Sequence, residues 1–406
     1  MTEGKVKGAL SGVRVLDLTD ERGIYGAKVI ADLGADVIRP EPLTGDPLRR
    51  RGPHQEGGAD GTSSLWHAFF ASNRRFFSLD VNSDTGRSQI GKLVERSDIV
   101  LCCEGHFALD AANLTDARKK KPELIVIDVS SFGPDGPWAD FIAPDLVAGA
   151  LGGFNATTGD ADTPPLKGFG DLNFMVSGAY VAIAALAALH HARKNGVGQH
   201  VDVSVHECIV SCLEHVLMCC WYDEYSPVTV PGLARQGSLH WSRAYTVMDA
   251  KKGSIMVTPA PDIEAQIFWL VQEDAFEDLL DEKYSDPENA VETTRRVMEV
   301  LQKWVSTKDA EELFLEGQSR HAPYGQVLPI ESVGENPQLQ ARKWWVDYTR
   351  KSAGDSNASK AHLKTNCKGP GAPYHFSATP WSIGPYGRPG EDTESILADI
   401  GWGDSL

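Results

Sequence analysis

The chain has 406 residues, of which 42% are hydrophobic and 23% are charged, and its formal net charge is −17 at pH 7. This length allows a large core in two or three domains, and the ordinary composition excludes a disordered, collagen-like or disulfide-scaffold protein. The acidic balance disfavours nucleic acid as a partner, because a polyanion needs a basic face.

The sequence also lacks the segments that direct proteins to membranes. No apolar run approaches the roughly 20 residues that cross a bilayer, and the first residues have no apolar core of a secretory signal. The seven cysteines include two adjacent pairs, a pattern that favours reduced thiols over a disulfide framework. We therefore expect a cytoplasmic protein with no membrane partner.

The first third of the chain alternates predicted strands with predicted helices. Such alternation is typical of βαβ units, so we expect an α/β fold with a mainly parallel, Rossmann-like sheet in a large domain. The predicted strands are 13–19, 35–39, 98–102 and 124–130, and the predicted helices are 24–33, 84–95 and 114–121.

The later part of the chain predicts a second, smaller α+β domain. Small-residue helices at 145–153 and 174–192, a strand at 201–205 and a long helix at 206–221 complete the first part of the large domain. The predicted boundaries are a large domain over 1–221, a Pro/Gly-containing linker over 222–241, a small domain over 242–324, and a return to the large domain over 325–406 that ends in a helix at 393–400.

Familiar cofactor and metal motifs are missing from the sequence. Neither GxGxxG nor a P-loop follows a strand, and GxSxG and HExxH do not occur. One predicted helix face carries Cys208, Cys212, His215 and Cys219. Those four side chains would span about 16 Å along a helix, too far to surround one zinc ion, so we expect buried thiols and no metal site.

Basic residues cluster locally in this acidic chain. The Lys119–Lys121 run ends a predicted helix, where cations complement the helix dipole. Another cluster is Arg49–Arg51. Arg74 and Arg75 lie between an aromatic stretch and a predicted strand at 76–81, and guanidinium groups beside aromatic rings can hold phosphate or stack on a purine. A phosphate site and a structural role both remain open here.

A GFGDLN motif at residues 168–173 precedes the small-residue helix at 174–192. Asp171 in this position has two possible roles. It can cap the helix N-terminus, as aspartates often do. Alternatively, its carboxylate is a nucleophile, because an ionised carboxylate needs no separate base to attack.

Motifs in the same order along nearly the whole chain resemble the class III CoA-transferases. This family includes formyl-CoA and carnitine CoA-transferases and also α-methylacyl-CoA racemases. The motifs are LSGVRVLDLT at 10–19, ADLGADVI at 31–38, GDP at 45–47, NRR at 73–75, SSFGPDGP at 130–137, GFGDLN at 168–173, GVGQHVDVS at 196–204, SATP at 377–380 and GEDT at 390–393.

The resemblance implies transfer of CoA from a donor such as succinyl-CoA to a carboxylic acid, with Asp171 as nucleophile. An aspartyl anhydride and an aspartyl-CoA thioester would be the intermediates. Backbone N–H groups at Gly168 and Gly170 would approach the developing oxyanion. CoA enters as a thioester substrate, with no permanently bound cofactor. The residues implied to contact it are Arg22, Arg39, Asn73, Arg74 and Arg75.

Several departures from the family pattern bear on the activity. The turn at 102–106 reads CCEGH where many members have Asn-Phe, and 236–238 is the nearest match to the glycine-rich loop that covers the active site. Pro144 replaces the histidine that partners the aspartate in the racemases, and proline cannot move a proton. CoA transfer is therefore favoured. The alternatives are an acyl-CoA racemase or epimerase and a non-catalytic, CoA-binding partner subunit.

The family also implies an interlocked dimer, either a homodimer or a heteromer with a related subunit. Aromatic residues around the linker suggest an aromatic or dicarboxylic acceptor such as benzylsuccinate, although a role in the core is equally compatible with them. The second carboxylate of a dicarboxylic acid would need a positively charged partner, which Arg235 or Arg243 could supply. The aromatic residues are Trp221, Tyr222, Tyr225, Trp241 and Tyr245.

Overall fold

The computed structural model describes residues 7–55, 63–159, 162–213, 216–217, 221, 235, 246–258, 263–348, 367–384 and 386–402. The chain forms two compact units. The large unit comprises Met1–Gly152, Gly168–Cys212 and Pro337–Leu406, and the small unit comprises Gly153–Lys167 and Leu213–Asn336. Most of the linker predicted at 222–241, including 236–238, lies outside the described residues.

The large unit is built on a six-stranded parallel sheet with strand order β3-β2-β1-β4-β5-β6. The central strand β4 is apolar and fully buried, and its neighbour β1 is buried except at Arg14, as expected for a sheet covered on both faces. The α/β prediction is confirmed. The strands are β1 (Arg14–Leu18), β2 (Asp36–Pro42), β3 (Arg74–Leu79), β4 (Ile99–Cys103), β5 (Ile125–Ser130) and β6 (His200–Ser204).

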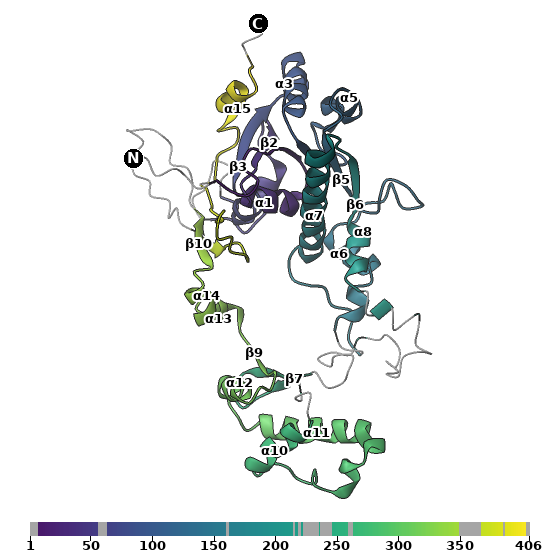
Figure 1. Ribbon diagram of the computed structural model, residues 1–406, viewed down its shortest axis with the longest axis vertical. Helices are drawn as coiled ribbons and strands as arrows, with labels where there is room; N and C mark the ends of the chain where they lie inside the picture. Colours follow the sequence, from purple (N-terminus) through teal and green to yellow (C-terminus); the bar gives the residue numbers. More distant parts are fainter. Residues whose placement is uncertain are drawn as a thin grey trace. The chain divides into compact units, whose positions relative to one another are not determined.

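One face of this sheet is covered by α1 (Ile24–Asp32) and α7 (Leu172–Asn195), which pack against each other (Figure 1). Their backbones approach closely at Gly26 and Gly178, where an added Cβ on Gly26 would lie 2.7 Å from the Gly178 carbonyl oxygen. By length and apolar composition α7 could span a membrane, although the sequence patterns predicted no run of that length. Its contacts with α1 and β5 make it a core helix.

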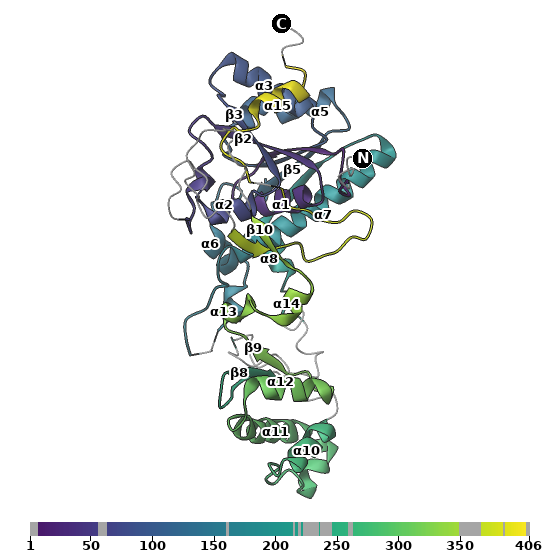
Figure 2. The ribbon, with the colours of Figure 1, turned by 90° about the vertical axis from the view of Figure 1, so that its left-hand side faces the viewer.

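The opposite face of the sheet carries α3 (Asp84–Glu95), α4 (Leu109–Ala112), α5 (Leu114–Lys120) and the C-terminal helix α15 (Thr393–Asp399). The segment leading into α15 bonds along β3, where Asp392 and Phe76 exchange hydrogen bonds. Figure 2 shows α15 beside α3 and β3. The return of the chain therefore covers the outer edge of β3.

The remaining elements of the large unit lie in the connections. An uninterrupted helix over 206–221 is wrong, because α8 ends at Ser211 and a turn begins at Cys212. His215 and Cys219 lie outside the described residues. The connecting elements are η1 (Pro47–Arg50), α2 (Leu65–Phe70), α6 (Asp145–Leu151), η2 (Asn155–Thr157, in the small unit), α8 (Val205–Ser211), α14 (Pro337–Ala341), β10 (Trp345–Tyr348) and β11 (Cys367–Pro370).

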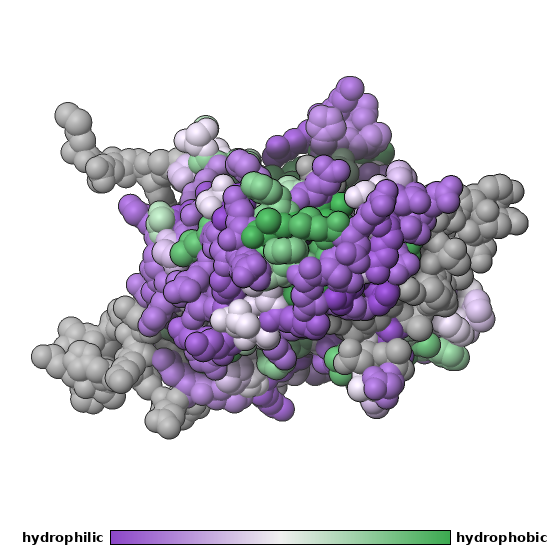
Figure 3. All heavy atoms as spheres, turned by 90° about the horizontal axis from the view of Figure 1, so that it is seen from below, coloured by the Kyte–Doolittle hydropathy of each residue, from purple (hydrophilic) through white to green (hydrophobic). Residues whose placement is uncertain are grey.

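The small unit packs helices on a three-stranded antiparallel sheet, β7-β8-β9. Trp269 and Trp304 meet edge to face at 5.0 Å in its core. The side that carries α10 and α11 is mainly hydrophilic, with apolar side chains gathered in a central strip (Figure 3). The elements are β7 (Thr246–Asp249), β8 (Ser254–Val257), α10 (Ile263–Gln272), η4 (Glu282–Ser285), η5 (Pro287–Asn289), α11 (Ala290–Val305), α12 (Ala310–Ser319), β9 (Gly325–Val327) and α13 (Ile330–Val333).

Candidate active site

Asp171 immediately precedes α7, but its carboxylate does not cap the helix. That role belongs to Asp145, at the start of α6, whose Oδ1 accepts a hydrogen bond of 3.1 Å from the backbone N–H of Phe174. The Asp145 carboxylate also accepts from the Asn173 side chain at 3.0 Å. Because a distant residue satisfies this end of α7, the Asp171 carboxylate is left available for other chemistry.

The Asp171 carboxylate is instead held by two side chains from the connection between β2 and β3. Arg51 Nη2 lies 3.0 Å from both carboxylate oxygens, and Trp66 Nε1 donates to Oδ2 at 2.9 Å. The Arg51 guanidinium lies over the Trp66 ring, 4.3 Å from its centroid. The carboxylate is partly exposed, at 17% of its side-chain surface. It is thus fixed in orientation and still open to a reactant.

The two glycines of the GFGDLN motif fit a tight turn before α7. Gly170 has a φ of +71°, in the left-handed region that favours glycine. A Cβ on Gly168 would lie 2.8 Å from Leu172 Cδ2. The backbone conformation therefore favours glycine at 170, whereas a side chain at 168 would displace the tip of Leu172. Their contribution to an oxyanion site stays a prediction.

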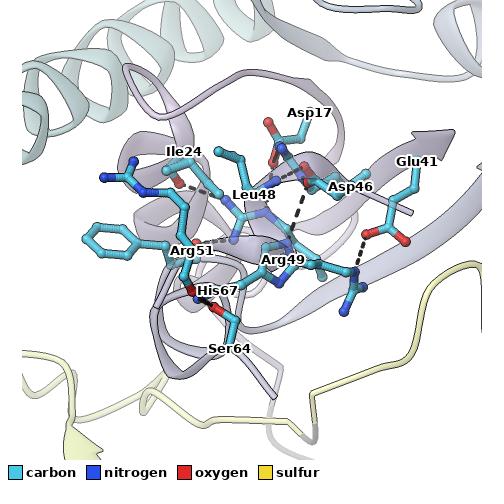
Figure 4. Close-up of polar contacts among 12 residues, drawn as sticks. Asp17, Ile24, Glu41, Asp46, Leu48, Arg49, Arg51, Ser64 and His67 are labelled. Atoms are coloured by element: carbon cyan, nitrogen blue, oxygen red, sulfur yellow. Dashed lines mark hydrogen bonds and ion pairs between the residues drawn. The ribbon is translucent and has the colours of Figure 1, made fainter. Parts of the chain in front are cut away.

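A buried ionic network lies beneath the segment that carries Arg51 (Figure 4). Arg39 pairs with Asp46 at 2.6 Å and with Asp17 at 3.1 Å. Asp46 in turn accepts from the backbone N–H of Leu48 and begins η1. The network thereby anchors η1, which ends one residue before Arg51, to the central strand β1.

Arg49 extends this network on its other side. Its Nε donates to Glu41 at 2.7 Å, and its guanidinium lies over the Phe76 ring, 4.3 Å from the centroid. The oxygens of Glu41 and Asp46 and a nitrogen of His67 lie within 4.8 Å of one another, a spacing that could suit a metal ion. Because each carboxylate already pairs with a guanidinium, we interpret the cluster as an ion-pair network.

Protonation of this network should make stability depend on pH. Burial lowers the pKa of His67 to about 3. Since the unfolded histidine titrates near 6.5, its contribution is complete above that pH and is lost as the pH falls toward 3, at up to about 1.4 kcal/mol per pH unit. Urea unfolding measures the free energy of unfolding at pH 6.5 and at pH 5. Its decrease between these two pH values should be about 2 kcal/mol smaller in His67→Gln than in the wild-type protein. Equal losses would contradict this assignment.

The residues predicted to bind CoA are separated by the structure into exposed and buried positions. Arg22 donates to the Asp20 carboxylate at 2.6 Å and to the Glu104 carbonyl at 3.1 Å, so it joins the ends of β1 and β4. This is the switch point where doubly wound sheets bind ligands. The altered turn at 102–106 therefore lies beside a predicted CoA residue.

Asn73 and Arg75 bind the C-terminal segment that returns to the large unit. Asn73 accepts from the backbone N–H of Gly384 at 2.6 Å, and Arg75 donates to Asp399 at 2.7 Å. Both side chains remain partly exposed. Their contact with CoA stays a prediction, alongside the structural role that the geometry gives them.

Arg39 and Arg74 are buried, with exposed fractions of 2% and 4%. Arg74 donates to Asp17 at 2.8 Å and to the Ile24 carbonyl at 2.7 Å. The strand β3 begins at Arg74 rather than at 76, and strand alternation turns this side chain inward with Phe76. In this structure both guanidiniums serve the internal network, and CoA binding by either residue stays a prediction.

Sequence reasoning missed Arg51 and Trp66 as partners of Asp171. The arginine stood out in a basic cluster and the tryptophan in an aromatic stretch, and each signal was visible separately. Their contacts with Asp171 span 120 and 105 residues of sequence, respectively. Strand and helix patterns do not specify contacts of that range.

Comparison with known proteins identifies the family to which the chain belongs. Residues 10–393 match CoA-transferase family III. The chain belongs to CoA-transferase family III. It is a class III CoA-transferase, as the sequence motifs suggested.

Relatives within family III cover almost the whole chain. A subunit of succinyl-CoA:(R)-benzylsuccinate CoA-transferase from Thauera aromatica is 28% identical over 97% of this chain and 94% of its own length. Succinate–glutarate CoA-transferase from Agrobacterium fabrum is also 28% identical, over 97% of this chain and 96% of its own length. A solved CAIB/BAIF family protein from Brucella suis matches the fold with a TM-score of 0.80 at 22% identity, covering 98% of this chain and 100% of that protein.

The Trp66 hydrogen bond gives a direct test of how this chain orients the Asp171 carboxylate. Trp66→Phe keeps an aromatic ring beneath Arg51 and removes only the N–H donor to Asp171. We expect kcat/KM for CoA transfer to fall about tenfold, the effect of losing one hydrogen bond to a carboxylate that takes part in turnover. An unchanged kcat/KM would show that this bond plays no part in turnover.

Proposed function

We propose that this chain transfers CoA from succinyl-CoA to a dicarboxylic acid, with Asp171 as the covalent nucleophile. The proposal rests on the arrangement around the Asp171 carboxylate. Asp145 caps α7 in its place, and Arg51 and Trp66 hold the Asp171 carboxylate in one orientation. A carboxylate that is fixed in orientation, partly exposed and not used to cap a helix N-terminus has the properties of a nucleophile.

The proposed reaction has two halves. An Asp171 oxygen attacks the thioester carbon of succinyl-CoA, and the C–S bond breaks to give a mixed anhydride and the CoA thiolate. The thiolate attacks Asp171 Cγ, which releases succinate and forms an aspartyl-CoA thioester. The acceptor carboxylate then attacks Cγ and expels the thiolate, and the thiolate attacks the acceptor acyl carbon to form the new CoA thioester and regenerate Asp171. The bond energy of the thioester is retained throughout, provided that water is excluded.

Relatives support the donor and the acceptor class. The Thauera aromatica and Agrobacterium fabrum enzymes pair succinyl-CoA or succinate with benzylsuccinate or glutarate. A Haloarcula hispanica relative, 30% identical over 85% of this chain, is a succinyl-CoA:mesaconate CoA-transferase. Each of these acids carries two carboxylates. Of the aromatic residues predicted to line the acceptor site, all except Trp221 lie outside the described residues, as does Arg243. Arg235, the other cation predicted for a dicarboxylate, donates to the Thr163 carbonyl.

The acceptor is identified by a transfer assay with succinyl-CoA and a panel of acids. We expect glutarate, mesaconate and benzylsuccinate to be converted to CoA thioesters faster than butyrate or benzoate. Faster conversion of the monocarboxylates would contradict the dicarboxylate proposal. Deuterium exchange at the α-carbon of a 2-methylacyl-CoA without any acceptor acid would instead identify a racemase. Transfer that requires an added related subunit would identify a heteromer.

We also propose that the chain assembles as a dimer through the outer surfaces of α6 and α7. These neighbouring helices expose six large apolar side chains, a density that marks an association surface on a protein of this kind. The residues, with exposed fractions, are Leu146 (53%), Val147 (38%), Leu151 (46%), Tyr180 (38%), Ile183 (61%) and Leu186 (37%).

A charge placed on this surface should weaken the dimer. In Ile183→Arg, a buried guanidinium without a partner would face the second copy, so we expect the dimer dissociation constant to rise at least tenfold. Light scattering during size-exclusion chromatography measures the mass against concentration. Ser88→Arg on α3, at the opposite face of the sheet, is the matched control. A dimer that is equally stable in both variants would contradict the assigned surface.

A further inference from the structure

The guanidinium of Arg51 is only partly used by Asp171. A single nitrogen, Nη2, serves both carboxylate oxygens at 3.0 Å, whereas a fork-like pairing would use two nitrogens. Within the described part of the chain, Nε and Nη1 make no hydrogen bond. The side chain is 35% exposed, and its plane is held against the Trp66 ring. Arg51 therefore presents unused donors directly beside the reacting carboxylate.

The charge next to Arg51 must change during the reaction, an argument that rests on the proposed function. In the free enzyme the negative charge is on Asp171. In the anhydride and in the aspartyl-CoA thioester Asp171 is neutral, and the charge is on the CoA thiolate, on the released acid or on the incoming acid. A fixed guanidinium loses its partner whenever Asp171 is covalently occupied, so another carboxylate can take that place.

We propose that Arg51 is the binding site for the reacting carboxylate of the incoming acid, and that it exchanges Asp171 for this carboxylate when the enzyme carries CoA. Once Asp171 is released, Nη2 together with Nε or with Nη1 can donate to both oxygens of a carboxylate in the fork geometry that arginine favours. A carboxylate held there lies next to Asp171 Cγ, the atom that it must attack. Its attack forms a C–O bond to Cγ, breaks the C–S bond and releases the thiolate.

Trp66 explains how Asp171 stays in place during this exchange. The indole N–H is neutral and donates to Oδ2, and it can do so whether Oδ2 belongs to a carboxylate or to the carbonyl of a thioester. Oδ1 receives only the Arg51 contact among the described residues. The two side chains thus have different roles. Trp66 donates to Asp171 in every state, whereas Arg51 binds whichever carboxylate is negatively charged.

The experiment measures acid binding without any turnover. Asp171→Asn has the shape of the native side chain without its charge, so it mimics the neutral, covalently occupied state. By isothermal titration calorimetry we expect Asp171→Asn to bind succinate at least tenfold more tightly than the wild-type protein, because Arg51 is unpaired and the repelling carboxylate is gone. The neutral diamide of succinic acid should bind neither protein detectably.

The double variants assign the effect to Arg51. Adding Arg51→Gln to Asp171→Asn should abolish the gain in succinate affinity, whereas adding Arg50→Gln should preserve it. Arg50 is an exposed arginine at the end of η1 and controls for the loss of one positive charge. Thermal unfolding of all variants verifies that they are folded. Equal succinate affinity in the Asp171→Asn protein with and without Arg51→Gln would overturn the proposal, as would no gain in Asp171→Asn itself.

These outcomes are separate from the test of the proposed function. A wild-type protein that transfers no CoA to any acid, yet shows the expected succinate affinities, would overturn the proposed function and leave the carboxylate site standing. Normal transfer to dicarboxylic acids together with unchanged affinities would overturn the Arg51 assignment alone.

Discussion

Replacing Asp171 with asparagine or alanine is expected to reduce the rate of CoA transfer by a factor on the order of 10⁴, because neither side chain can form the proposed anhydride. The fold should remain intact. The lost contacts are a partly exposed ion pair and one hydrogen bond, which together contribute about 1–2 kcal/mol. Steady-state transfer from succinyl-CoA and urea unfolding of the same samples measure the two effects.

Asp145→Ala is the matched control for this loss of activity. It removes the carboxylate that caps α7 and leaves the Asp171 carboxylate unchanged. We expect a loss of about 1–2 kcal/mol in stability. The decrease in transfer should be far smaller than in Asp171→Asn. If Asp171→Ala retained full turnover, or if Asp145→Ala were the less active of the two, the division of roles between these aspartates would be wrong.

The largest effect on stability is expected for Arg74→Met. Asp17 is completely buried, and Arg74 and Arg39 together lower its pKa to about 2 despite the cost of burial. Without Arg74, Asp17 loses one of its two positive partners, and the Ile24 carbonyl loses a donor. Breaking a buried ion pair in this way should lower the free energy of unfolding by about 3 kcal/mol.

The neighbouring arginine provides the comparison. Arg75 pairs with Asp36 and Asp399 at the surface, where solvent screens ion pairs, so Arg75→Gln should cost less than about 1 kcal/mol. Urea unfolding midpoints of the two variants measure the difference. Similar destabilisation by both substitutions would contradict the burial of Arg74 in the internal network.

The sequence predicted the fold closely where local patterns determine structure. The strand predicted at 124–130 became β5, and the helix predicted at 84–95 became α3 with the same bounds. The boundary at Arg74 was missed because two arginines rarely open a buried strand. The burial of Arg74 becomes interpretable only once its pairing with Asp17 is known, whereas Arg75 points the other way and pairs with Asp36 and Asp399.

The candidate site was predictable only in part. The glycine-rich turn and the position before α7 singled out Asp171, but a helix cap and a nucleophile look alike in sequence. The structure removes the capping role from Asp171, because Asp145 caps α7 from another helix, and the role as nucleophile stays a proposal. Arg51 was visible as part of a basic cluster, and its role emerged only from a contact across 120 residues.

The covalent role of Asp171 is tested most directly by trapping the intermediate. The protein is incubated with succinyl-CoA and hydroxylamine, which attacks an aspartyl anhydride or thioester and leaves a hydroxamate on the side chain, and its peptides are analysed by mass spectrometry. We predict a hydroxamate at Asp171 that requires succinyl-CoA. Transfer-competent protein whose Asp171 remains unmodified, or whose only hydroxamate lies on another carboxylate, would contradict the account.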